Sequence, residues 1–263
     1  MCGVSELPPR PSERFGAADL QVHTSYGDGM ADARTIFERI QATTNLDVVA
    51  VTDHDDIGGA LLAREVHARG AYRFEFVPGI EVTTRSGHLL ALWIDQPIAS
   101  FRPLAETVAT IHRLGGLAVI PHPFSYLTRS IGQRALERLL ALDDPETNPD
   151  GIEVANLTLA GRVTGAKALR WNRAHGHLAE TGGSDAHFPE EVGNAYTAFP
   201  GANAEELRRA ILAGETRGIA GTPLSLRQVG LRRILAQQVR GLSVTPRVML
   251  GRVARRLVHA GQS

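Results

Sequence analysis

Short apolar runs alternate with helical segments along most of this chain, and the alternation restricts the folds that it can adopt. The runs LDVVAVTDH (46–54), FEFVPGIEV (74–82) and GLAVIPH (116–122) are largely apolar, which is typical of strands that are buried on both faces. Residues 57–70 and 103–116 have helical patterns that close on glycine stop signals. Buried strands separated by helices predict a parallel sheet with helices outside it.

Two architectures contain a sheet of this kind. A (βα) barrel is the leading interpretation, because about seven strand–helix units follow one another without a linker. A doubly wound open sheet is the alternative, but no G-x-G-x-x-G motif follows the first predicted strand, DLQVH (19–23), to support a dinucleotide site. With 263 residues and 43% hydrophobic content, the chain is long enough to bury either core.

Composition divides the chain into three parts. Residues 1–14 are polar and proline-rich, and we expect a flexible arm there, while residues 15–220 are expected to form the barrel. Residues 221–263 form a basic extension, because nine arginines but no acidic residues follow Glu215. Its apolar residues at helical spacing are Leu231, Ile234, Leu235, Val239, Val253 and Leu257. This spacing predicts helices that pack on the barrel, with contact to an anionic membrane or RNA as the alternative.

Cysteine content and the N-terminus bear on location. Cys2 is the only cysteine, which excludes an intrachain disulfide and favours the cytoplasm. No apolar run approaches the roughly 20 residues of a membrane span, and the N-terminus lacks the apolar core of a signal peptide. The formal net charge is zero, so overall charge gives no reason to expect a polyanionic partner.

Histidine and acidic residues gather where the predicted strands end. These residues are His23, His54, Glu81, His122, Asp185 and His187. His88 instead opens its strand and can face the same rim from an antiparallel or irregular strand. The carboxyl ends of barrel strands form one rim, which holds the active site. Imidazole and carboxylate groups without cysteine suit zinc, manganese, iron or similar divalent metals. The histidines interpreted as surface or packing residues are His67, His112, His175, His177 and His259.

Five motifs, in this order, resemble those of the PHP phosphoesterases, a family named for polymerase and histidinol phosphatase. The motifs are DLQVHTSYGDG, VTDHD, PGIEVTT with GHLLAL, PHP and GGSDAH. The resemblance covers residues 15–220. It implies an α/β fold, namely a distorted (βα)7 TIM-like barrel of the PHP type with residues 221–263 as a helical extension. It also implies two or three divalent metal ions at the rim.

The resemblance further implies three groups of metal ligands. The groups are His23, Glu81 and Asp185 for the first metal, Glu81, His88 and His122 for the second, and Asp28, His54 and His187 for the third. Gln21 stands where the family usually has a further histidine at the first metal. An amide oxygen is a weaker ligand than imidazole for zinc-like metals, so the site is expected to be weakened but competent. Asp19 would be an outer partner that orients a ligand.

Such a centre predicts hydrolysis of a phosphate ester by a metal-activated water, without a serine or cysteine nucleophile. The favoured substrate is a phosphomonoester, either a small phosphorylated metabolite or a nucleotide. Asn156, Arg129 and Arg162 are candidates for substrate binding. Exonuclease-like cleavage of short oligonucleotides is one alternative, and a degenerate barrel that acts as a binding or scaffold module is another.

Amidohydrolases are the rival barrel family. Many of them have H-x-H on the first strand and a lysine that bridges two metals. Here the first of those histidines is replaced by Gln21, and the only lysine, Lys167, lies on a helical segment. The sequence therefore favours the phosphoesterase over the amidohydrolase interpretation.

Overall fold

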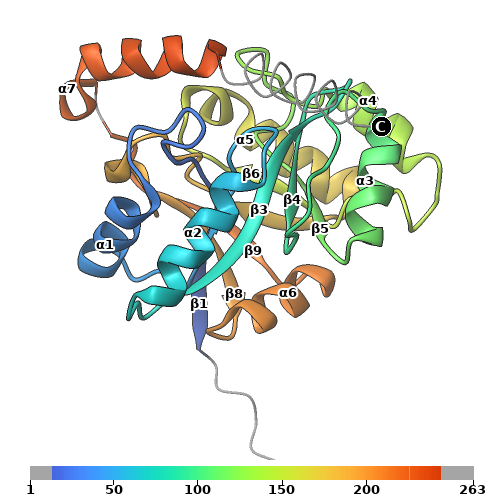
Figure 1. The fold of residues 1–263 in the computed structure, drawn as a ribbon. Coiled ribbons are helices and arrows are strands. Elements are labelled where there is room, and N and C mark those ends of the chain that lie inside the picture. The colour runs from blue at the N-terminus through green and yellow to red at the C-terminus, as the bar shows by residue number, and fades with distance from the viewer. Residues whose placement is uncertain (1–13, 225, 244–263) are drawn as a thin grey trace, which may run out of the picture.

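The computed structural model describes residues 14–224 and 226–243, and Figure 1 shows their fold. The strands are β1 Phe15–Val22, β2 Val48–Val51, β3 Glu75–Thr83, β4 His88–Leu92, β5 Leu117–Ile120, β6 Gly151–Ala155, β7 Ala179–Gly182, β8 Ala195–Pro200 and β9 Arg217–Ala220. The α-helices are α1 Ala33–Thr43, α2 Gly58–Arg69, α3 Leu104–Arg113, α4 Gln133–Leu140, α5 Leu159–Trp171, α6 Ala204–Leu212 and α7 Leu226–Val229. A π-helical turn at Asn172–Gly176 and a 3-10 turn at Pro189–Glu191 flank β7.

In the part of the chain that the structure describes, the strands form one curled sheet in the order β7-β6-β5-β4-β3-β2-β1-β8-β9. Its edges approach each other, because Thr197 Oγ1 in β8 donates to the carbonyl of Gly182 and accepts from the N–H of Gly182 at the end of β7. Thr216 Oγ1, just before β9, donates to the carbonyl of Glu180 in β7. Helices lie outside the sheet (Figure 1). The predicted α/β barrel is therefore confirmed as a nearly closed barrel-shaped sheet.

The sheet is mixed rather than wholly parallel. β4 runs antiparallel to β3 and β5, which lets His88 reach the rim from the first residue of its strand, as expected. β8 and β9 are antiparallel strands that the sequence pattern did not predict. Neither contains a continuous apolar run: buried residues alternate in β8, and the residues of β9 are half-buried or exposed.

The helices form where capping residues and apolar stripes coincide, and α6 is an example. The Asn203 side chain accepts a hydrogen bond from the backbone N–H of Glu206 and so caps the N-terminus of this helix. Leu207 and Ile211 lie one turn apart and are both buried against the barrel. Gly214, with φ 68°, adopts the left-handed conformation that ends the helical segment.

Residues 231–243 form a further helix over the loop that follows β1, at the top of Figure 1. The predicted packing on the barrel occurs, but polar side chains make it: Gln237 and Arg240 contact the loop. The apolar residues expected at this contact face away, because Leu231, Leu235 and Val239 are 65%, 58% and 71% exposed.

Some predictions fall on residues that the structure does not describe. These are residues 1–13 of the arm and, in the extension, Val253, Leu257 and His259. Within residues 14–224 and 226–243, no helix has both the length and the apolar character needed to cross a bilayer. The division into arm, barrel and extension stays a prediction.

Candidate metal centre

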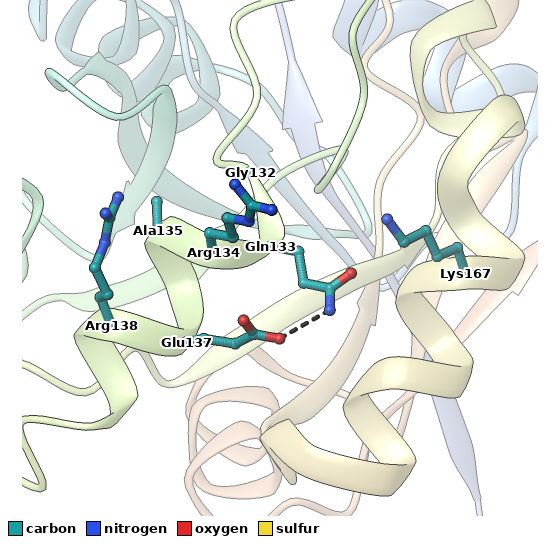
Figure 2. A pocket seen from close by; sticks show the side chains of 7 residues that line it. All are labelled: Gly132, Gln133, Arg134, Ala135, Glu137, Arg138 and Lys167. Atoms are coloured by element: carbon teal, nitrogen blue, oxygen red, sulfur yellow. Dashed lines mark hydrogen bonds between the residues drawn. The ribbon is translucent and has the colours of Figure 1, made fainter.

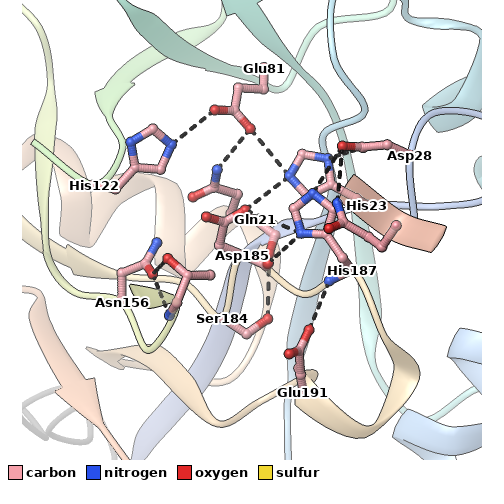
Figure 3. A network of polar contacts seen from close by, with 12 residues as sticks. Gln21, His23, Asp28, Glu81, His122, Asn156, Ser184, Asp185, His187 and Glu191 are labelled. Carbon is pink, nitrogen blue, oxygen red and sulfur yellow. Dashed lines mark hydrogen bonds and ion pairs between the residues drawn. The ribbon is translucent and has the colours of Figure 1, made fainter. Parts of the chain in front are cut away.

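The predicted ligands meet at one rim of the barrel because backbone hydrogen bonds hold the strand ends together. Figure 3 shows the side chains of His23, Asp28, Glu81, His122, Asp185 and His187 beside one another. The N–H of His23, just after β1, donates to the carbonyl of Ala186 after β7 at 2.9 Å. The N–H of Asp55, just after His54, donates to the carbonyl of Glu81 in β3 at 3.0 Å. The rim thus places side chains from distant parts of the chain within reach of one another.

Glu81 lies at the centre of the cluster and is fully buried. Its Oε1 lies 2.7 Å from His88 Nδ1 and 3.1 Å from His122 Nε2. Its Oε2 lies 3.2 Å from His23 Nε2 and 3.7 Å from His54 Nδ1. Each oxygen of one carboxylate therefore faces a different pair of imidazoles, which is the arrangement that a bridging ligand requires.

Asp28 organises a neighbouring group of imidazoles. Its Oδ2 lies 3.2 Å from His187 Nε2 and 3.9 Å from His54 Nε2, and its Oδ1 lies 3.8 Å from His23 Nδ1. The ring of His23 stacks between those of His54 and His187, with centroids 4.8 and 4.4 Å away. His23 therefore adjoins both carboxylates, with one ring nitrogen toward each.

Asp185 completes the first predicted group. Its Oδ1 lies 3.2 Å from His23 Nε2 and 3.8 Å from His187 Nδ1. Asp185 has φ 53° and His122 has φ 30°, conformations that non-glycine residues seldom adopt and that cost about 1–3 kcal/mol. Such strain concentrates where backbone must aim a functional side chain.

Three donor groups among the described residues have ligand atoms that all lie within 4.8 Å of one another. They are His23, Asp28, His54 and His187; His54, Glu81 and His88; and His23, Glu81 and Asp185. Two ligands about 2 Å from one cation are at most about 4 Å apart, so these groups are close to binding geometry. The group of His23, Glu81 and Asp185 is the first predicted group. The other two differ from the prediction: His23 joins Asp28, His54 and His187, and His54 takes the place of His122 beside Glu81 and His88.

Several buried atoms at the cluster fit a bound cation. Buried polar atoms are normally hydrogen-bonded, yet Gln21 Oε1 has no hydrogen-bond partner, and Asp28 Oδ1, His88 Nδ1 and both ring nitrogens of His23 make only the ion-pair contacts given above. Gln21 Nε2 donates to Glu81 Oε2 at 2.8 Å, which leaves the amide oxygen buried beside the first group. Oxygen and imidazole donors of this kind suit divalent metals.

The carboxylates and imidazoles of the cluster shift each other's pKa values. Burial opposes the charged imidazoles, but the facing carboxylates raise the pKa of His23, His122 and His187, so a metal that binds these rings must displace their protons. Burial alone would raise the pKa of Glu81, but neighbouring histidines, His54 foremost, lower it well below its usual range. Burial opposes ionisation of Asp28 as well, and the hydrogen bond from His187 and the charge of that ring lower its pKa nevertheless. Burial lowers the pKa of His54 to about 4, although Glu81 acts in the opposite direction. Ionised carboxylates and neutral imidazoles are the forms that bind metals.

His122 shows what holds the cluster together without a cation. Burial lowers its pKa, but the hydrogen bond and charge of Glu81 outweigh that effect and raise it to about 9. A proton on His122 therefore offsets the negative charge of Glu81, as a metal ion would. Metal binding at this position should release that proton.

Buried carboxylates behind the ligands hold their backbone in place. Asp19 accepts from the N–H of Ser184 at 2.9 Å and of Gly193 at 2.8 Å, so it fixes the loop that carries Asp185 rather than touching a histidine. Glu153 in β6 accepts from the N–H of His122 at 2.7 Å. Such outer partners orient metal ligands.

Glu153 and Asp53 are outer partners that the sequence did not identify. Asp53 accepts from the N–H and the hydroxyl of Thr24, whereas Asp55 accepts from the N–H and hydroxyl of Thr83. The crowded TDHD motif thus sends only His54 into the cluster. Side chains alternate between the two faces of a strand, so this alternation could have distinguished His54 from Asp53 and Asp55. The acid within the apolar run GIEVAN could likewise have identified Glu153.

The candidate substrate residues are not equivalent. The Asn156 amide donates to Glu153 Oε2 and its oxygen accepts from Thr158, so it shapes a loop at the rim. Arg129 is exposed, and its carbonyl accepts from the N–H of His88 at 2.7 Å, which places its backbone at the rim. Arg162 is exposed in the first turn of α5.

The histidines assigned to packing lie away from the cluster. His67 on α2 packs edge-on against Phe37, and its Nε2 donates to the carbonyl of Phe74. His112 on α3 pairs with Asp150 at 3.0 Å. Neither has an atom in the three donor groups.

A hollow of about 570 Å³ lies between α4 and α5 and is separate from the metal centre (Figure 2). Arg134, Arg138 and Lys167 line it, together with Glu137, whose carboxylate accepts from Gln133. None of the predicted metal ligands lines this hollow. It therefore does not extend the site.

The fold is that of a PHP-type barrel, and the donor cluster at its rim fits divalent metal binding. Comparison with known proteins agrees. The PHP-associated family model matches residues 166–216, which run from α5 to the residue before β9 and include Asp185 and His187.

Two curated relatives match parts of the chain. It is 29% identical over 150 residues to an uncharacterized protein of Methanocaldococcus jannaschii, covering 53% of this chain and 81% of the relative. It is 31% identical over 81 residues to the 5'-3' exoribonuclease Rnm of Salmonella typhimurium, covering 29% of this chain and 27% of that protein.

Solved structures share the fold. A two-domain protein of Bacteroides vulgatus that contains a predicted PHP-like metal-dependent phosphoesterase matches with a TM-score of 0.61 and 17% identity, covering 83% of this chain and 70% of that one. An amidohydrolase of Chromobacterium violaceum, with bound sulfate and no metal, matches with a TM-score of 0.54 and 22% identity, covering 77% and 97%. These matches confirm the resemblance to the PHP family that the motifs indicate.

Proposed function

We propose that this protein is a metal-dependent hydrolase of phosphate esters and that it acts on a phosphomonoester. The observation that carries the proposal is that each pair of donor groups shares one residue, either His23, His54 or Glu81. Shared ligands hold cations close together, as in the paired-metal sites that catalyse phosphoryl transfer. Two or three ions of zinc, manganese or iron are proposed.

The chain's own residues would divide the work at this centre. Bound divalent cations would supply a water of lowered pKa and would polarise the phosphate oxygens. His23, Glu81 and Asp185 are almost fully buried and would fix the inner part of the centre. The side chains of His54 and His187 are 16% and 17% exposed, so the substrate phosphate would approach from their side.

Arg129 is the proposed phosphate-binding side chain. Its backbone lies against His88, its guanidinium is exposed, and a guanidinium binds phosphate oxygens in a bidentate manner. Arg162 remains a second candidate at the start of α5. Asn156 is proposed to support the rim, because Glu153 and Thr158 already use both ends of its amide.

Exonuclease-like cleavage of short oligonucleotides is the second candidate, favoured by the partial match to an exoribonuclease. A substrate panel separates the two: an aryl phosphate, nucleoside monophosphates and a short RNA, each with added manganese. We expect phosphate release from the monoesters, and a higher KM for Arg129→Gln than for the control Arg85→Gln. Cleavage of RNA without any release of phosphate from monoesters would favour the exonuclease instead. The single cysteine keeps a cytoplasmic location as a prediction.

A further inference from the structure

The helix at residues 231–243 places one polar side chain against the metal centre. Gln237 is only 7% exposed, although Leu235, Gln238 and Val239 beside it are exposed. Its Nε2 lies 3.5 Å from Oδ2 of Asp28, a member of the donor group that includes His54 and His187. Buried amide groups are normally hydrogen-bonded, and few other side chains of this helix are buried. The burial of Gln237 therefore requires an explanation.

Two arginines tie this helix to the loops that carry the ligands. Arg240 donates through Nε to the carbonyl of Gly27 at 2.9 Å and through its terminal nitrogen to the carbonyl of Ser25. Both carbonyls belong to the loop that leads to Asp28. The Arg240 side chain therefore holds the helix against this loop by hydrogen bonds to two backbone carbonyls.

Arg233 provides the second attachment. Its two terminal nitrogens each lie 3.1 Å from a carboxylate oxygen of Glu190, and its guanidinium lies 4.9 Å from the ring centroid of Phe188. Phe188 directly follows His187 in the chain. The helix thus spans from the Asp28 loop to the His187 loop, which supply ligands to the same donor group.

Gly241 lets the helix approach the carboxylate. A Cβ at this position would lie 3.1 Å from Oδ2 of Asp28, a distance that is too short without adjustment. Glycine inside a helix lowers its stability by about 0.5–1 kcal/mol relative to alanine. The close approach of the helix to Asp28 offsets this loss. Gln237 and Gly241 lie one turn apart and face the same oxygen.

We propose that Gln237 is a positioning residue for the donor group of Asp28, His54 and His187, and that Arg233 and Arg240 hold it there. The inference rests on the proposed metal centre. The Gln237 amide donates to Asp28, and its oxygen accepts from Nε2 of Gln238 at 2.7 Å. Rotation of the amide by 180° would exchange its two ends and turn the oxygen toward a bound cation, at the loss of the bond from Gln238. The basic extension would then complete the metal centre of the barrel.

Manganese titration of the full-length protein tests this inference without using activity. Asp28→Asn removes a predicted ligand and identifies the binding step that belongs to this donor group. We expect Gln237→Ala and Arg240→Ala to weaken that step about tenfold or more and to leave the other steps unchanged. Arg232→Ala, an exposed arginine on the same helix, is the matched control and should bind as the wild type does.

Gln237→Glu distinguishes a role at the metal from a purely structural one. A carboxylate beside Asp28 repels it without a cation, so the metal-free protein should melt at a lower temperature than the wild type. The rise in melting temperature on manganese addition should be larger than that of the wild type. The inference would be overturned if both alanine variants bound manganese as the wild type does and if manganese raised the melting temperature of Gln237→Glu no more than that of the wild type. The proposed metal centre would stand in that case. A wild-type protein that binds no manganese would instead contradict the proposed function.

Discussion

Gln21 donates a hydrogen bond from Nε2 to Oε2 of Glu81 at 2.8 Å, and its own amide oxygen, equally buried, has no hydrogen-bond partner. The amide thus steadies the carboxylate at the centre of the cluster and leaves an acceptor free for a cation. Glutamine at this position therefore keeps a donor atom beside the group of His23, Glu81 and Asp185, which is proposed to bind the first metal. This relationship supports a weakened but competent site.

Gln21→His should tighten binding at the first metal, because imidazole is the better ligand for a zinc-like ion. Activity should be equal to or higher than that of the wild type. Gln21→Ala should bind that metal more weakly and regain activity in excess metal, since His23, Glu81 and Asp185 remain. Zinc titration with parallel assays checks both variants. Loss of activity in Gln21→His at saturating zinc would show that the amide has another role, such as contact with substrate.

Glu81→Ala should lose at least two ions and nearly all hydrolysis, because Glu81 faces His23, His54, His88 and His122 through its two oxygens. Glu81→Gln should retain the fold but bind metal weakly, since a neutral amide cannot bridge two cations as a carboxylate does. Metal content after dialysis measures the loss. Retention of full metal content by Glu81→Ala would show that the donor groups are independent of this residue.

Asp19→Ala should destabilise the protein by about 2–5 kcal/mol, because it leaves the buried N–H groups of Ser184 and Gly193 without an acceptor. Metal affinity should fall too, since Ser184 precedes Asp185. Urea denaturation measures the stability. Asp47→Ala is the control: Asp47 also accepts a backbone N–H, from Ala17, but far from the rim, so it should not alter metal binding.

His112 predicts a pH dependence that is independent of the metal centre. Its two nitrogens face acceptors, Asp150 Oδ2 and the carbonyl of Glu146, so the doubly protonated ring satisfies both. The hydrogen bond to Asp150 outweighs partial burial and raises the pKa above 6.5. The folded state therefore holds the proton more tightly, and the stabilisation is present below pH 6.5 and lost as the pH rises through the folded pKa.

The measurement is the difference in unfolding free energy between the wild type and His112→Gln from about pH 6 to about pH 9. The wild-type advantage should shrink as the pH rises. It should depend on pH less when Asp150 is replaced by asparagine, because only the bond to the carbonyl of Glu146 then favours the proton. An advantage that grows with pH would contradict the assigned hydrogen bonds.

Much of the site was predictable because strand ends carry a local signal. His54 and His122 directly follow apolar runs, and the carboxyl ends of barrel strands share one rim, so their meeting follows from topology alone. The same reasoning predicts that Glu81 lies at this rim. The closure of the barrel was less predictable, because the contact of Thr197 with Gly182 depends on β8, a short strand whose buried residues merely alternate.

The outer parts of the site lacked such a signal. Gln237 meets Asp28 across 209 residues, and no periodicity in the sequence links a glutamine on a basic helix to a loop after the first strand. The apolar residues of that helix suggested the opposite face as the contact. Asp53 and Glu153 were missed because a buried acid can hold backbone as well as bind metal, and only the three-dimensional neighbours separate these roles.

Metal content and hydrolysis of an aryl phosphate, measured together on protein purified without chelator, test the central claim most directly. The cluster around Glu81 and Asp28 predicts two or three divalent ions per chain and phosphate release that chelation abolishes and added manganese or zinc restores. Protein that contains no metal and stays inert with either ion would contradict the proposed function.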